Sequence, residues 1–200
     1  TNLDYLISFS TSGRVYCRGL RELSEAKIPE LPFSSLVEPA PNESFHTFFV
    51  GKPNDRFMLL TQCGRGLTTK MDKVLSKTKV GKAFLNLDDG DKPLTIIPIS
   101  KEESALALLT INGYLLVIGT DSVKELLAGG RGVNLMSLRP GDQIRSACLV
   151  GETGLEFGAL TKKGQSKVFK LSRNKLLDFI GKRSQKGRKV NSSLTIESMK

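Results

Sequence analysis

Short apolar runs alternate with polar turns along the chain, and four of these turns follow one pattern. Each run ends in Ser or Thr, and a Gly follows three positions later. The four segments are Tyr5–Gly13, Phe57–Gly64, Ala105–Gly113 and Glu156–Gly164. Their final glycines are spaced 51, 49 and 51 residues apart. Because a fixed period is the signature of a repeat architecture, the chain is predicted to contain four repeats of about 50 residues.

Each shared segment predicts a β-hairpin. A Gly at the turn can take a positive φ without steric cost, and a second strand-forming run follows it. These second runs are Arg14–Arg18, Arg65–Thr69, Tyr114–Ile118 and Gln165–Phe169. The Ser or Thr hydroxyl is expected to hydrogen-bond to the backbone of its own turn.

A connection and a turn follow each hairpin. The connections contain Leu and cover Leu20–Leu23, Met71–Leu75, Ser122–Leu127 and Asn174–Leu177. The third of them could form one or two helical turns. The turn combines Gly with a basic residue at Gly81–Lys82 and Gly130–Gly132, whereas the first repeat has Ile28–Pro32 and the fourth has Gly181–Lys182 or Gly187–Arg188.

Two further strands are predicted to complete the repeats. The earlier strand, together with a polar turn that follows it, covers Leu36–Glu43, Ala83–Asp91 and Val133–Asp142, and the closing strand covers Phe45–Val50, Leu94–Ile99, Ile144–Val150 and Leu194–Glu197. We therefore predict an all-β fold, a propeller-like array of four-stranded antiparallel blades in a single domain, with repeats at 1–50, 51–100, 101–150 and 151–200. A blade cannot bury both faces alone, so the alternating apolar positions are expected to form cores between blades.

Composition narrows the class of protein. Hydrophobic residues make up 39% of the chain, which is enough for packed cores, and no apolar run is long enough to span a bilayer. We therefore expect no membrane partner. Cys17, Cys63 and Cys148 are odd in number and far apart, which argues against disulfides and a zinc site and for a reducing cytoplasm.

The formal net charge of +10 favours a polyanionic partner. Residues 151–200 contribute 12 basic and 4 acidic side chains, and residues 51–100 contribute 9 and 5. With few aromatic residues and no long basic helix, the pattern favours a surface that contacts the backbone of bent duplex DNA. The alternatives are a merely solvated basic surface and, for 182–189, a solvated loop. The predicted DNA-binding residues are Arg65, Lys70, Lys73, Lys77, Lys79, Lys82, Arg131, Lys162, Lys163, Lys167, Lys170, Arg173, Lys175, Lys182, Arg183, Lys186, Arg188 and Lys189.

No combination of residues predicts catalysis. His46 is the only histidine, so a catalytic triad that contains His, or a His-rich metal site, would have to rest on this one residue. The glycines around Arg131 lack the sequence context of a phosphate-binding loop. Asp88, Asp89 and Asp91 could hold a cation, but such acidic segments are usually plain turns. We predict no catalytic residue, no metal site and no cofactor in this chain.

The Ser/Thr-x-x-Gly hairpins, the Gly-basic-Gly turn and the Leu-x-Pro-Gly-Asp-x-Ile element at Leu138–Ile144 resemble the C-terminal domain of bacterial type IIA topoisomerase A subunits. The resemblance covers essentially the whole chain. The hairpin Leu106–Leu116 and the basic segment Gly181–Lys189 are more similar to topoisomerase IV than to DNA gyrase. The resemblance implies a β-pinwheel whose blades exchange strands, and duplex DNA that bends around a basic rim.

It also implies a cytoplasmic, nucleoid-associated bacterial enzyme that separates chromosomes by decatenation and supercoil relaxation. This domain would capture and orient DNA for strand passage, while the rest of the A subunit joins an ATPase B subunit in a heterotetramer that uses ATP and Mg²⁺. Relatives commonly carry five or six blades, so either one blade lies outside this sequence or the array is open.

Two alternatives stay open. A gyrase wrapping domain would carry a seven-residue box rich in Gln, Arg and Gly, and the nearest string here, Gly129–Gly132, lacks its Gln-Arg lead. A protein-binding propeller of the regulator of chromosome condensation type also repeats at about 50 residues, but its usual Trp-Gly is absent because the chain has no Trp.

The charge distribution predicts where DNA binding is concentrated. Charge reversal at Lys167, Lys170 and Arg173 is expected to weaken duplex binding more than the same change at Arg14, Arg18 and Arg21. Titration of labelled duplex with each triple variant measures the difference. Equal losses would show that the net charge of a repeat does not locate the DNA path.

Overall fold

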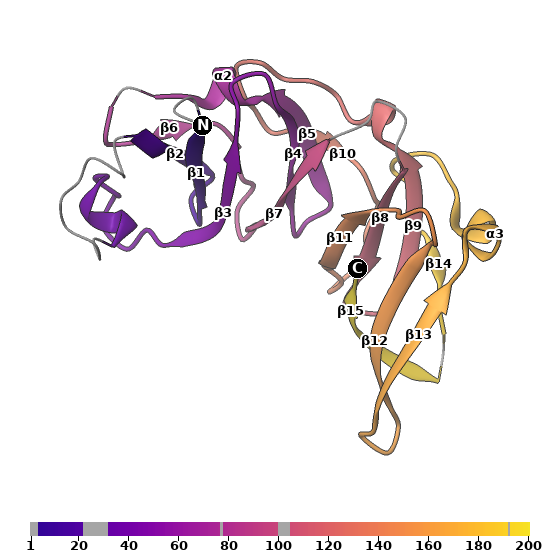
Figure 1. Cartoon of the computed structure of the whole chain (residues 1–200). Coiled ribbons are helices and arrows are strands. Elements are labelled where there is room, and N and C mark those ends of the chain that lie inside the picture. Colours follow the sequence, from indigo (N-terminus) through magenta and orange to yellow (C-terminus); the bar gives the residue numbers. More distant parts are fainter. Residues whose placement is uncertain (1–3, 22–31, 77, 100–104, 192) are drawn as a thin grey trace. The chain divides into compact units, whose positions relative to one another are not determined.

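The computed structural model describes residues 4–21, 32–76, 78–99, 105–191 and 193–200 (Figure 1). Strands dominate it, which confirms the predicted all-β class. They are β1 (Tyr5–Ser10), β2 (Arg14–Gly19), β3 (Phe45–Gly51), β4 (Arg56–Thr61), β5 (Arg65–Lys70), β6 (Lys82–Ala83), β7 (Pro93–Ile99), β8 (Ala105–Thr110), β9 (Tyr114–Gly119), β10 (Val133–Asn134), β11 (Ile144–Leu149), β12 (Leu155–Thr161), β13 (Ser166–Leu171), β14 (Arg188–Lys189) and β15 (Leu194–Met199). The helical segments are single turns, namely η1 (Phe33–Ser35), α2 (Met71–Val74), η2 (Thr120–Ser122), α3 (Arg173–Leu176) and η3 (Leu177–Phe179). None of the described helices is long and apolar enough to cross a bilayer.

The predicted hairpins are confirmed as β1–β2, β4–β5, β8–β9 and β12–β13. In each turn the Gly N–H donates to the carbonyl of the Ser or Thr three residues earlier, at 3.0, 3.2, 2.9 and 2.8 Å in chain order. The hydroxyl of that Ser or Thr accepts from the N–H of the residue after the Gly, at 3.2, 3.3, 3.2 and 3.1 Å. The turn glycines have φ between 75° and 79°. The same local chemistry therefore closes all of these turns.

The closing strands are also confirmed, as β3, β7, β11 and β15, whereas the earlier strand-and-turn segments are confirmed only in part. Within 83–91 and 133–142 the pairing is limited to β6, β10 and the isolated bridges of Leu85 and Met136, and turns follow. Residues 36–43 form turns without a strand. Residues 36–43 form no strand because Pro39 and Pro41 have no N–H to donate to a ladder. The predicted helical turns at 122–127 are wrong too, because the 3-10 turn ends at Ser122 and Glu125 makes a parallel bridge to Thr68.

The short strands show the exchange that the resemblance implies. β6 follows the second hairpin in sequence but pairs with β2 of the first, with Val15 opposite Lys82. In the same way β10 pairs with the start of β5, and β14 pairs with the start of β9. Each exchanged segment also donates to the turn glycine of the earlier hairpin: Leu85 to Gly13 at 2.9 Å, Leu135 to Gly64 at 2.8 Å, and Val190 to Gly113 at 3.0 Å.

The chain divides into two compact units, each with its own core. The first comprises Thr1–Leu60, Leu67–Ser100 and Glu125–Gly132, and the second comprises Thr61–Gly66, Lys101–Lys124 and Val133–Lys200. The first unit contains the sheet β3-β1-β2-β6 together with β7 and most of β4 and β5. The second contains β10, the start of β5, and the sheets β11-β8-β9-β14 and β13-β12-β15.

In both units the core lies between sheets, as the alternating apolar positions predict. The buried residues of the first core are Ile7, Phe9, Val15, Cys17, Phe57, Leu59, Leu67, Met71, Val74, Phe84, Leu85 and Ile96. Those of the second are Ala107, Leu109, Leu115, Val117, Leu155, Phe157, Ala159, Leu176, Ile196 and Met199. Met58 and Leu60, on the opposite face of β4, are buried as well, so the apolar middle of this strand is covered on both faces.

Glu43 anchors the first hairpin turn. Its carboxylate accepts hydrogen bonds from the hydroxyls of Ser10, Ser12 and Tyr16 and, at 3.0 Å, from the N–H of Ala40. Burial alone would raise the pKa of Glu43, but these donors outweigh it and hold the pKa below its ordinary value of 4.5. Burial, and then the bond to Glu43, raises the pKa of Tyr16.

Substituting the turn glycines tests the exchanged contact. A Cβ on Gly13 would lie 2.1 Å from the carbonyl oxygen of Leu85, whereas a Cβ on Gly164 would meet nothing within 4 Å. Both residues have positive φ, so Gly164→Ala should cost about 1 kcal/mol of unfolding free energy for φ alone. Gly13→Ala should cost about 3 kcal/mol or more because the Leu85 backbone must move. Urea unfolding followed by circular dichroism measures both, and equal costs would contradict the close approach.

Acid should weaken the Glu43 anchor. Because its folded pKa is lowered, its contribution to stability is complete above the unfolded pKa and is lost as the pH falls through the folded pKa. Glu43→Gln should therefore destabilise the chain at neutral pH and flatten the loss of stability between about pH 5 and pH 3. Urea unfolding across this range tests it, with the exposed Glu38→Gln as the control. Parallel pH profiles for wild type and Glu43→Gln would refute the role.

Candidate nucleic-acid interface

The predicted basic residues of the second unit lie mainly on one hairpin and one turn. Lys162 and Lys163 are exposed at the tip of the β12–β13 hairpin, and Lys167 and Lys170 are exposed on β13. Arg173 and Lys175 lie on α3, which follows β13. The exposed residues Lys182, Arg183, Lys186, Arg188 and Lys189 follow η3 and end in β14.

In the first unit the predicted residues are more scattered. Lys70 ends β5, Lys73 lies on α2, Lys79 is in the exposed segment after it, and Lys82 is in β6. Arg131 lies in the glycine-rich segment before β10. Arg65 begins β5 and belongs to the second unit. Lys77 lies outside the described residues. Which of these side chains meet a ligand stays a prediction.

The two predicted lysines of β13 do not share one face of the strand. Lys167 lies opposite Ala159 and Lys170 opposite Glu156, so these lysines, three positions apart, point to opposite faces. Both are nevertheless exposed, because β13 is at the edge of the order β13-β12-β15.

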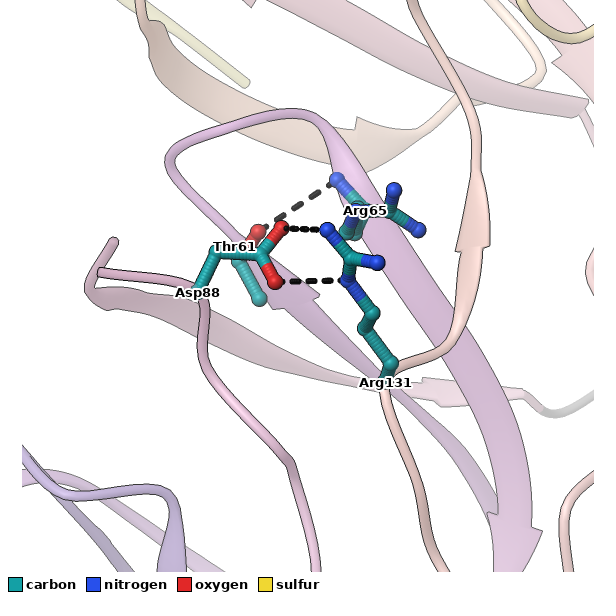
Figure 2. A network of polar contacts seen from close by, with 4 residues as sticks. All are labelled: Thr61, Arg65, Asp88 and Arg131. Atoms are coloured by element: carbon teal, nitrogen blue, oxygen red, sulfur yellow. Dashed lines mark hydrogen bonds and ion pairs between the residues drawn. The ribbon is translucent and has the colours of Figure 1, made fainter. Parts of the chain in front are cut away.

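Arg131 is already paired with a carboxylate. Its Nε lies 2.6 Å from Oδ1 of Asp88 and its Nη2 lies 2.7 Å from Oδ2, so the pair is bidentate (Figure 2). The hydrogen bonds to Asp88 raise the pKa of Arg131. The pair joins segments more than 40 residues apart, next to the parallel bridge between Leu85 and Gly130. Figure 2 also shows the Thr61 hydroxyl accepting from the N–H of Arg65.

Other predicted lysines are compensated in the same way. Glu156 accepts from Lys170 at 3.0 Å and from Lys200 at 3.2 Å, and the bond from Lys170 is the main cause of its lowered pKa. Lys73 lies 2.8 Å from Asp72. Such surface pairs add little to stability, but each places a negative charge where a phosphate would otherwise approach.

Two further predicted residues donate to backbone carbonyls, and within the described ranges no carboxylate forms an ion pair with either of them. Lys82 Nζ donates to the carbonyl of Lys73 at 2.8 Å and lies 5.5 Å from the Phe84 ring centroid. Arg173 Nε donates to the carbonyl of Gly151 at 3.2 Å. These contacts fix the position of a cation without neutralising it.

Sequence reasoning missed Arg139. Its guanidinium carbon lies 3.4 Å from the centroid of the Tyr114 ring, and its Nη1 donates to the carbonyl of Lys186 at 3.1 Å. Lys189 Nζ lies 5.0 Å from the same centroid. The only signal in the sequence was a basic residue directly before the Pro140–Gly141 turn, and its partners are distant along the chain.

The residues considered for chemistry have structural surroundings. His46 Nε2 lies 2.8 Å from the carbonyl oxygen of Leu94 on an exposed part of β3. Cys17, Cys63 and Cys148 form no disulfide among the described residues, and burial raises the pKa of Cys148 to about 11. Within the described ranges, no group of three or more His, Cys, Asp or Glu side chains could hold a metal ion.

The fold and the distribution of cations define a basic, propeller-like β domain with exchanged strands. The family profile of the DNA gyrase C-terminal domain, a beta-propeller, matches residues 55–100 and 105–147. The A subunit of DNA topoisomerase 4 from Pseudomonas aeruginosa is 26% identical over 190 residues, which cover 93% of this chain and 25% of that protein. Its counterpart from Rickettsia bellii is 25% identical over 185 residues, covering 92% and 24%. The chain thus spans about a quarter of the curated relatives it matches.

Solved structures show the same fold. The C-terminal domain of E. coli ParC matches with a TM-score of 0.84 at 16% identity, over 100% of this chain and 81% of that one. The DNA gyrase A C-terminal domain matches with a TM-score of 0.71 at 20% identity, over 97% and 64%. The chain is therefore similar in fold to the C-terminal domains of ParC and DNA gyrase A, as the resemblance of its repeats predicts.

Proposed function

We propose that this chain is the non-catalytic DNA-binding and bending domain of a topoisomerase IV, carried on its A subunit. It captures duplex DNA and orients it for strand passage by the rest of the enzyme. Similarity to topoisomerase 4 subunits over nine-tenths of the chain carries the proposal. The gyrase and protein-binding alternatives are less favoured, because the curated relatives share the topoisomerase 4 name and the matched folds come from topoisomerase subunits.

The exposed cations of the second unit support a phosphate-contacting role. Among the described residues, no carboxylate forms an ion pair with Lys162, Lys163, Lys167, Lys175, Lys182, Arg183, Lys186, Arg188 or Lys189. Neutralising phosphates by such side chains releases condensed counterions, which drives binding without sequence preference. Bent duplex suits a surface of this kind because the contacts lie along the backbone.

The chemistry of the reaction belongs to other parts of the enzyme in this proposal. The remainder of the A subunit would cleave and rejoin DNA, and an ATPase B subunit would complete a heterotetramer. ATP and Mg²⁺ would bind to those parts. We place the assembled enzyme on the bacterial chromosome in the cytoplasm, where it would remove supercoils and decatenate replicated DNA.

Duplex binding at increasing salt tests this function. Arg18 is unsuitable for charge reversal because its side chain is 9% exposed and donates to the carbonyl of Leu36 at 2.8 Å. A reversed charge there would damage folding. Replacing Lys162, Lys163 and Lys167 with Gln should weaken binding at low salt by roughly ten-fold or more and reduce the log–log salt slope by about 2 to 3. Fluorescence anisotropy of a labelled duplex measures both quantities.

The matched control replaces three exposed lysines outside the predicted set, Lys52, Lys92 and Lys124, with Gln. It makes the same change in net charge and should leave the affinity within about two-fold of wild type. Failure of the unsubstituted chain to bind duplex at low salt would refute the proposed function. Equal losses of affinity in the two triple variants would show that binding depends on net charge alone.

A further inference from the structure

We propose that Arg139, Tyr114 and Lys189 form a preorganised clamp for one stretch of phosphate backbone. The inference rests on the proposed function and adds to it a residue, Arg139, that the sequence did not single out. All three residues belong to the second unit. They come from the turn before β11, the start of β9 and the end of β14.

The stack on Tyr114 holds the guanidinium of Arg139 in place. At 3.4 Å from the ring centroid to its central carbon, the planar group lies against the aromatic ring at van der Waals distance. One of its N–H groups donates to the carbonyl of Lys186, 3.1 Å away. A guanidinium carries five N–H donors, so donors remain at its edge for an external acceptor.

Lys189 is fixed against the same ring by two contacts. Its backbone pairs with Tyr114 in the β14–β9 ladder, and its Nζ donates to the carbonyl of Asn112. Its Nζ also lies 5.0 Å from the Tyr114 ring centroid. The register of the exchanged strand therefore determines where this cation sits.

Neither cation is neutralised by its surroundings. Within the part of the chain that the structure describes, Arg139 and Lys189 form no ion pair with a carboxylate. Asp142 Oδ1 instead accepts from the N–H groups of Asn112 and Gln143. This contrasts with Arg131, whose guanidinium is matched bidentately by Asp88. Two like charges held at one ring repel each other, and a phosphate bridging them would remove that repulsion.

A phosphodiester backbone fits this arrangement better than an isolated anion does. The cluster lies beside further exposed cations, Lys186 and Arg188, on the same turn and strand. A chain of phosphates could contact several of these side chains in succession, whereas a single ion would meet only one or two. Planar guanidinium and point-like ammonium together recognise phosphate by geometry and by charge.

Duplex binding by Arg139→Gln, Lys189→Gln and the double variant of the 200-residue chain tests the clamp. The double variant should lose roughly ten-fold in affinity at low salt, and its salt slope should fall by about 2, one unit for each phosphate contact. The matched control is the double variant Lys124→Gln and Arg145→Gln, which removes two exposed cations of the same unit that lie outside the predicted set. Its affinity should stay within about two-fold of wild type.

Variants that keep the charge separate a clamp from net charge. Tyr114→Phe retains the ring face and should bind as wild type, whereas Tyr114→Leu removes no charge but should weaken binding. Arg139→Lys keeps the charge without the planar stack and should fall between wild type and Arg139→Gln. Circular dichroism and the midpoint of thermal unfolding show whether each variant is folded.

The outcomes distinguish the clamp from the proposed function. Wild-type binding with an unchanged slope in the Arg139 and Lys189 double variant, or an equal loss in the Lys124 and Arg145 control, would overturn the clamp and leave DNA binding intact. A lowered unfolding midpoint with unchanged slope would likewise overturn it and assign the three residues to folding alone. If wild type binds no duplex at low salt, both the function and the clamp are refuted.

Discussion

A backbone hydrogen bond to a turn glycine is the contact on which the rest of this structure depends. Gly13, Gly64 and Gly113 each present a carbonyl to the segment that follows the next hairpin along the chain. At Gly13 and Gly64 the approach is so close that a Cβ would lie 2.1 and 2.7 Å from a carbonyl oxygen. The glycine therefore serves two needs, the positive φ of its own turn and the space for a neighbouring backbone. Because the partner comes from the next repeat, each hairpin is completed by residues about 70 to 77 positions later in the chain.

Sequence reasoning succeeded where the determining contacts are local. The Ser/Thr-x-x-Gly turns were predictable because the hydroxyl, the carbonyl and the glycine all lie within five residues. It failed at 36–43, where Pro39 and Pro41 outweighed the apolar run, and at 122–127, where Glu125 pairs with Thr68 instead of continuing a helix. The exchange of β6, β10 and β14 was predicted from the resemblance alone, because the sequence of a two-residue strand does not indicate which strand it pairs with.

Counting charges identified the basic regions but not which cations can meet a ligand. Arg131 and Lys170 contribute fully to the formal charge, yet Asp88 and Glu156 pair with them. Asp88 lies more than 40 residues from Arg131, so its effect is invisible in a local window. Arg139 shows the opposite error: its position as a cation is fixed by Tyr114 and Lys186, which lie 25 and 47 residues away in the sequence. Local net charge is thus a guide to regions, and the tertiary partners decide which side chains can meet a phosphate.

The strand exchange links the fold to the binding surface. β14 completes the β8–β9 sheet by pairing Lys189 with Tyr114, and the same pairing brings the Lys189 ammonium to the ring on which Arg139 is stacked. The carbonyl of Lys186, just before that strand, accepts from Arg139 and holds the other side of the cluster. A phosphate bound to both cations would therefore also favour the docked position of β14, because a ligand stabilises the arrangement that binds it. The pairing of β14 with β9 therefore both completes the β8–β9 sheet and places Lys189 beside Arg139.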